Sequence, residues 1–191
     1  MSAFDPAAYG PVFAALLKTP RIMALDPGEE NGSAKAGLEA LNLDEAFAPN
    51  RITDRTMAEG CQSGLWLYHD FLVTSHTLSQ QITTPTGSYW HGIMHRREPD
   101  YPNGKYWFGR VGDHDIYPEL RDEAATIASG TDNLPDEAAY LMSQSSWDPY
   151  AFIDLCEGAN VGGVPAGDLC RGIQQREWEL LFDYCYRKAI A

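Results

Sequence analysis

Residues 53–82 read TDRTMAEGCQSGLWLYHDFLVTSHTLSQQI, the longest uninterrupted helical pattern in the chain. Thr53 or Asp54 supplies an N-cap, and no proline follows within the segment. At about 100° per residue, apolar side chains fall on two nearly opposite faces. One face carries Leu65, Tyr68 and Leu72, and the other carries Leu67, Phe71, Leu78 and Ile82. A helix that is apolar on two sides packs between other helices, so this segment predicts one long central helix.

Helix-start signals recur on both sides of this segment, as in Asp5-Pro6 and Asp148-Pro149, because proline is favoured at the first helical position. Runs that alternate apolar and polar residues, as strands do, are absent from the sequence. We therefore predict an all-α, single-domain helical bundle over residues 1–191, with about seven helices around the central one. The segments outside the central helix that show helical patterns are 6–17, 33–41, 88–98, 105–112, 118–128, 136–145, 149–158 and 167–188, with a turn at 99–104. The loop PRIMALDPGEENGS at 20–33 is rich in Pro, Gly and acids, so we interpret residues 1–50 as a peripheral arm.

Composition narrows the class of protein. Hydrophobic residues make up 44% and charged residues 21% of the 191 residues, which is typical of a folded globular protein. The formal charge of −13 disfavours nucleic acids and anionic membrane surfaces as partners. The sequence shows neither a signal peptide nor a long apolar run, and its four cysteines form no CxxC pair. We therefore expect a cytoplasmic protein with buried, reduced thiols.

Four of the five histidines lie within residues 69–95, at positions His69, His76, His91 and His95. Residues seven or four apart share one face of a helix, so each pair points in one direction. The short turn TTPTGS makes the two helices antiparallel neighbours. We predict that His91 and His95, with His69 or His76, hold one divalent ion.

Zinc or iron is the expected cofactor, because imidazole is a frequent ligand of both metals. Glu98, Asp100 and Asp70 are nearby carboxylates that could complete the coordination or orient an imidazole, and His114 could serve from a loop. An open coordination position would activate water or bind substrate, with Glu98 as the general base. Two alternatives stay open: histidines satisfied by hydrogen bonds near the core, and acid–base or ligand contact without a metal.

The stretch from Tyr89 to Arg110 mixes aromatic with charged side chains and holds much of the positive charge of the chain. Arginine and lysine suit anionic groups, and flat rings offer stacking surface, so a small anionic or hydroxylated molecule is the expected ligand. The substrate-binding candidates are Arg96, Arg97, Lys105, Arg110, Tyr101 and Trp107. The alternative is structural: arginines in the last turn of a helix complement its dipole and pair with acids.

The runs GSYWHGIMHRREPDYPNGKYWF at 87–108, HDF at 69–71 and REWELLFDYCYR at 176–187 resemble a family of bacterial and fungal hypothetical proteins. That resemblance implies no activity and carries over no catalytic residue. The combination of one histidine with a His-x3-His pair is also similar, in its site logic, to the metal site of DinB-like four-helix proteins. In that family the pair lies on a late helix, whereas here it follows a short turn.

These patterns together predict a metal-dependent helical protein, a hydrolase or oxidoreductase acting on a small anionic or hydroxylated molecule. The alternative is a non-catalytic module that binds a small ligand or a protein, with structural histidines. A purely structural subunit of a homo-oligomer is the third reading.

Overall fold

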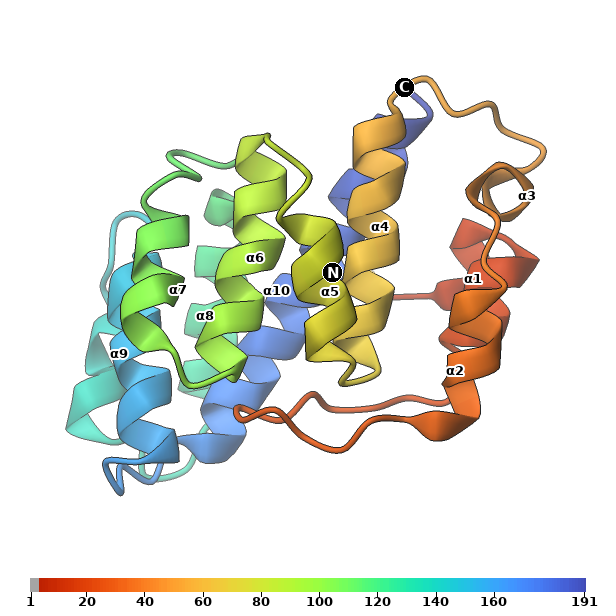
Figure 1. The fold of residues 1–191 in the computed structure, drawn as a ribbon. Coiled ribbons are helices and arrows are strands. Elements are labelled where there is room, and N and C mark those ends of the chain that lie inside the picture. The colour runs from red at the N-terminus through yellow and green to blue at the C-terminus, as the bar shows by residue number, and fades with distance from the viewer. Residues whose placement is uncertain (1–3) are drawn as a thin grey trace.

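The computed structural model describes residues 4–191, which form ten α-helices and two 3-10 helices and contain no strand (Figure 1). The predicted all-α, single-domain fold is confirmed. The helices are η1 (Pro6–Tyr9), α1 (Pro11–Leu16), α2 (Gly32–Glu39), α3 (Leu43–Phe47), α4 (Arg55–Tyr68), α5 (Leu72–Ser79), α6 (Pro85–Arg97), α7 (Tyr101–Phe108), α8 (Tyr117–Ser129), η2 (Asp136–Met142), α9 (Pro149–Asn160) and α10 (Gly167–Ala189).

Helix α6 lies at the centre of the molecule, because every residue from Thr86 to Arg97 is buried. It packs against α4, α5 and α7. Glycines permit two of these close approaches. A Cβ atom on Gly64 of α4 would lie 2.8 Å from the Trp90 ring, and one on Gly92 would lie 2.7 Å from the Phe108 ring of α7. The most buried helix is therefore the one that carries His91 and His95.

The predicted single helix over 53–82 is wrong: the chain forms α4 and α5, which are separated by a sharp turn. The end of α4 is a Schellman motif, in which Asp70 N–H donates to Leu67 O and Phe71 N–H donates to Trp66 O. Asp70 adopts a φ of 66° there, a left-handed conformation that favours glycine but that Asp tolerates. The rings of Phe71 and Trp66 pack at 5.2 Å and complete the motif.

Other element boundaries also differ from the predictions. Gly10, with a φ of 92°, divides the predicted helix 6–17 into η1 and α1. Helix α7 begins inside the predicted turn 99–104, because Asp100 caps it through the Asn103 N–H. The predicted helix 136–145 is the 3-10 helix η2, and α3 was not predicted.

The N-terminal part of the described chain is packed into the core. Phe13 of α1 and Phe47 of α3 are fully buried, and both contact Tyr186 of α10. In Figure 1 the extended segment between α1 and α2 runs beneath the ends of α4, α5 and α6. Through these contacts the segment that we interpret as a peripheral arm packs against α10.

Helix α10 is the longest helix among residues 4–191 and packs against α4, α8 and α9. Its Trp178 Nε1–H donates to the Gly64 carbonyl of α4 at 2.8 Å. None of the helices in this part of the chain is both long enough and apolar enough to cross a membrane. The four cysteines are buried free thiols.

Candidate metal centre

Three histidines from α5 and α6 meet at one point, and we call His76, His91 and His95 the histidine cluster. Each offers a ligand atom, and these atoms all lie within 4.8 Å of one another. The ring centroid of His76 is 4.5 Å from that of His91 and 5.3 Å from that of His95. The three side chains therefore lie close enough to bind one metal ion.

The two helices place these rings by simple periodicity. Thr84 caps α6 by accepting from the Gly87 N–H, and Pro85 starts the helix, which sets His91 and His95 one turn apart on one face. Helix α5 packs against α6 and supplies His76. His91 and His95 are 1% and 4% exposed, whereas His76 is half-buried, so the cluster opens toward solvent on the side of α5.

A hydrogen-bonded serine fixes the tautomer of His91. Ser79 Oγ lies 3.2 Å from the His76 carbonyl oxygen and 3.0 Å from His91 Nδ1. Because a carbonyl can only accept, the hydroxyl donates to it and accepts from the His91 Nδ1–H. The lone pair of His91 is then on Nε2. A histidine that binds a metal likewise uses one ring nitrogen as the ligand and donates a hydrogen bond from the other, which we call its outer nitrogen.

His95 is held in the same way by a carboxylate. Its Nδ1 lies 3.1 Å from Glu98 Oε2, so Nδ1–H donates to the carboxylate and Nε2 keeps the lone pair. Asn103 Nδ2 lies 3.1 Å from that Nε2 and donates to it. The half-buried Asn103 amide must turn away before His95 can bind an ion.

The surroundings keep these two imidazoles neutral. Burial, followed by the neighbouring His95 and His76, lowers the pKa of His91 to about 3. Burial also lowers the pKa of His95, although Glu98 opposes the shift. Neutral imidazole is the form that binds metal, so protons do not compete for these nitrogens near neutral pH.

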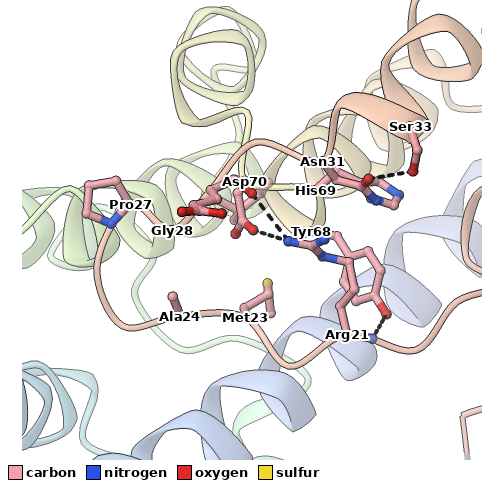
Figure 2. Close-up of polar contacts among 12 residues, drawn as sticks. Arg21, Met23, Ala24, Pro27, Gly28, Asn31, Ser33, Tyr68, His69 and Asp70 are labelled. Atoms are coloured by element: carbon pink, nitrogen blue, oxygen red, sulfur yellow. Dashed lines mark hydrogen bonds and ion pairs between the residues drawn. The ribbon is translucent and has the colours of Figure 1, made fainter.

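His69 lies outside the histidine cluster. Its Nε2 is 3.0 Å from the Leu16 carbonyl and its Nδ1 is 3.0 Å from Asn31 Nδ2, so both ring nitrogens are already paired. Figure 2 shows His69 beside Asn31 and next to Asp70, at the turn that ends α4. That turn carries His69 away from the direction of His76, so of the two alternatives His76 is the residue that joins His91 and His95.

The two arginines at the end of α6 are internal. Arg97 pairs with Asp70 and donates to the carbonyl oxygens of Leu67 and Ala24 at 2.8 and 2.9 Å. Asp70 also pairs with Arg21, as the dashed lines in Figure 2 show. Arg97 therefore connects the segment after α1 to the end of α4. It is fully buried, so it cannot contact a ligand that enters from solvent.

Arg96 is 1% exposed and pairs with Glu177 of α10. Its guanidinium also donates to Gln174 Oε1 at 3.2 Å and lies 4.7 Å from the centroid of the Phe152 ring. Tyr89 donates to the other oxygen of Glu177 at 3.0 Å. These contacts join α6 to α9 and α10, so the structural reading of Arg96 fits the geometry and the predicted contact with substrate does not.

The remaining predicted ligand-binding residues divide into two groups. Tyr101 is buried and accepts from Asn160 Nδ2 at 3.0 Å, and Lys105 pairs with Asp154 of α9. Trp107 packs against the His91 ring, with centroids 4.0 Å apart and ring planes tilted by 39°, and the Arg110 guanidinium lies 5.6 Å from the centroid of the Trp107 ring. Among these four, Trp107 and Arg110 are the pair that adjoins the histidine cluster.

Sequence reasoning did not place two polar residues beside the histidines. Ser79 lies three residues after His76 and resembles an ordinary serine near a helix end, and Asn103 lies in a segment that was predicted to be a turn. Only their distances to His91 and His95 reveal them. Comparison of the chain with protein-family models, with curated protein sequences and with solved structures finds no match.

Proposed function

We propose that this protein binds one divalent transition-metal ion through His91 Nε2, His95 Nε2 and a ring nitrogen of His76. The observation that carries the proposal is the convergence of three ligand atoms within 4.8 Å, two of them on buried rings whose outer nitrogens are already hydrogen-bonded. Orientation of ligand histidines by a carboxylate or a hydroxyl is typical of protein metal sites.

The donor set favours zinc over iron. Zinc centres with three protein ligands and one open position are common in enzymes, and three histidines are one of their ligand sets. Mononuclear iron(II) sites of oxygenases typically combine two histidines with a carboxylate. Within residues 4–191, no carboxylate belongs to the same cluster as the three histidines. The nearby Glu98 contacts Nδ1 of His95 and not the Nε2 that we propose as the ligand atom.

A hydrolase acting on a small anionic or hydroxylated molecule is the activity we propose for this centre. A bound zinc ion supplies a Lewis acid and lowers the pKa of its water. Trp107 and Arg110 would then position the ligand beside His91, the ring by its apolar face and the guanidinium by its charge. Glu98, predicted as a general base, is better placed to orient His95.

A metal-free binding module is the second candidate. It is favoured by one observation, the hydrogen bond from the Asn103 amide to His95 Nε2, which satisfies that lone pair without an ion. In this case Trp107 and Arg110 bind a small ligand directly, and the three rings form a polar wall beside them.

Elemental analysis of protein purified without chelators distinguishes the two candidates. We expect about one equivalent of zinc in the natural protein and loss of that metal in the double variant His91→Ala/His95→Ala. The matched control is His69→Gln, because His69 has the same residue type and a similar burial but lies outside the cluster. Metal content that is unchanged in the double variant, or absent from all three proteins when they are dialysed against zinc, would overturn the proposal.

A further inference from the structure

A second candidate site is a cleft on the other side of α7, between its C-terminal end, the start of α8 and the loop that leads into α9. The cleft has a volume of about 600 Å³, which falls within the usual range for small-molecule sites. Its walls include four aromatic side chains, Phe108, Tyr117, Trp147 and Tyr150, and we call it the aromatic cleft. Trp107 packs against His91, whereas the next residue, Phe108, lines this cleft, so the two sites use different faces of α7.

Two hydrogen-bond donors that belong to residues lining the cleft are unsatisfied. The Tyr117 hydroxyl and the Trp147 Nε1–H are buried, and neither finds a partner within residues 4–191. The two residues are only 9% and 5% exposed. A buried donor without an acceptor costs free energy, so a ligand that brings acceptor oxygens to this cleft would remove that cost.

The charges on the lining disfavour an anion. Arg121, the one arginine or lysine among the residues that line the cleft, already pairs with Asp122 and donates to the Ser145 carbonyl oxygen at 2.7 Å. Asp113 and Asp148 also line the cleft, and His114 is neutral because burial lowers its pKa to about 4. The carboxylates can accept from hydroxyl groups and would repel phosphate or carboxylate ligands.

The aromatic side chains of the lining give the cleft its apolar surface. Tyr150 is 42% exposed, whereas Phe108 and Trp147, which also line the cleft, are buried. A purely apolar ligand would leave the two donors unpaired, and a simple ammonium ion has no acceptor for the indole N–H. The ligand must combine apolar faces with groups that both donate and accept.

We propose that the aromatic cleft binds a neutral carbohydrate. The C–H faces of a sugar ring stack on Tyr150 and its neighbours. Its oxygens accept from Tyr117 and Trp147, and its hydroxyl groups donate to Asp113 or Asp148. This site is independent of the histidine cluster and needs no metal.

Indole N–H resonances in proton–nitrogen NMR spectra test the proposal directly. The chain has five tryptophans, and the Trp147→Phe spectrum identifies the resonance of Trp147 by its absence. The full chain is titrated to about 20 mM with glucose, galactose, mannose and N-acetylglucosamine, and separately with inorganic phosphate and choline. We expect at least one sugar to move the Trp147 resonance downfield, because the N–H gains an acceptor, and phosphate and choline to leave it in place.

Two variants check the assigned contacts. Tyr117→Phe keeps the ring and removes one donor, so we expect about tenfold weaker sugar binding. Tyr150→Ala changes an exposed ring, does not disturb the core, and is expected to weaken binding by a similar factor. Tyr106→Ala, which removes an exposed ring of α7 outside the cleft lining, is the control that should bind the sugar normally. If none of the four sugars moves the Trp147 resonance, or phosphate or choline moves it instead, the proposal is overturned.

Discussion

At the scale of single residues, the histidines divide according to what their nitrogens contact. In the histidine cluster, Ser79 and Glu98 each occupy the outer nitrogen of a buried ring and leave the other nitrogen directed to a common point. His69 has partners on both nitrogens and serves as a structural link to Leu16 and Asn31. His69, His91 and His95 are all buried histidines, so their hydrogen-bond partners determine which of them direct a ring nitrogen to the common point.

His114 predicts a pH dependence of stability. Burial lowers its pKa from 6.5 to about 4, so below pH 6.5 the unfolded chain binds a proton that the folded chain does not. The free energy of unfolding therefore falls as the pH drops from 6.5 toward 4, with a contribution from His114 of up to about 2 kcal/mol by about pH 5. Urea unfolding of metal-free protein across this range measures the effect.

The His114→Gln variant isolates this residue, because glutamine can keep a hydrogen bond to Thr86 and does not titrate. We expect a shallower loss of stability in the variant between pH 6.5 and about 5 than in the natural protein, and equal slopes above pH 6.5. Burial also lowers the pKa values of His69, His91 and His95, so part of the slope remains in the variant. Identical slopes in both proteins would show that His114 is protonated when folded.

At the scale of elements, the break between α4 and α5 determines which histidines meet. In one continuous helix His69 and His76 would share a face, since seven residues turn through nearly two full turns. The Schellman motif at Asp70 ends α4 at Tyr68, with His69 as the C-cap, and α5 starts in a new direction and brings His76 to α6. Asp70 also holds two arginines, so one residue links the helix end with the packing of the N-terminal segment.

Asp70→Ala is expected to destabilise the protein by about 3–5 kcal/mol, because it leaves the buried Arg97 without its counter-ion. Denaturant unfolding measures the change. The control is Asp44→Ala, which removes an exposed pair with Arg55 and should cost about 1 kcal/mol or less. Asp70→Asn keeps a residue that tolerates the left-handed backbone and removes only the charge.

If Asp70→Asn matches the natural protein, the backbone conformation and not the charge is what Asp70 supplies. If both Asp70 variants are as mild as Asp44→Ala, then Arg97 is satisfied by the carbonyl oxygens of Leu67 and Ala24 alone. A large loss in both variants supports the ion pair as the main stabilising contact at this junction.

At the scale of the whole molecule, both the net charge and the packing favour the binding of a cation at the histidine cluster. A formal charge of −13 attracts divalent cations to the protein. The cluster is assembled from α5 and α6, and those helices are held by the core, so an ion bound there binds the folded chain alone. We therefore expect the proposed metal binding to be coupled to folding.

Zinc is expected to raise the Tm of the metal-free protein. At a free concentration about 100-fold above the dissociation constant, the folded state gains about 2.7 kcal/mol. For a chain of 191 residues this corresponds to a rise of about 5–10 °C. Differential scanning fluorimetry with and without zinc measures it, and magnesium, which prefers oxygen ligands, is the control ion.

The His91→Ala/His95→Ala variant should lose this response, and His69→Gln should retain it. An equal rise in the natural protein and the double variant would mean that zinc binds elsewhere on the acidic surface. A rise with magnesium of similar size would point to the same conclusion.

Hydrophobic periodicity and helix caps are local properties, and for this reason the sequence by itself determined the all-α class, most of the helices, and the spacing that sets His91 and His95 on one face. The tertiary structure decided the features that depend on contacts between residues far apart in the sequence. Arg97 and Arg21 pair with Asp70 at the turn that divides the predicted central helix, and Arg96 is buried in an ion pair with Glu177. Those contacts bring together residues up to 81 positions apart, and no local pattern carries that information.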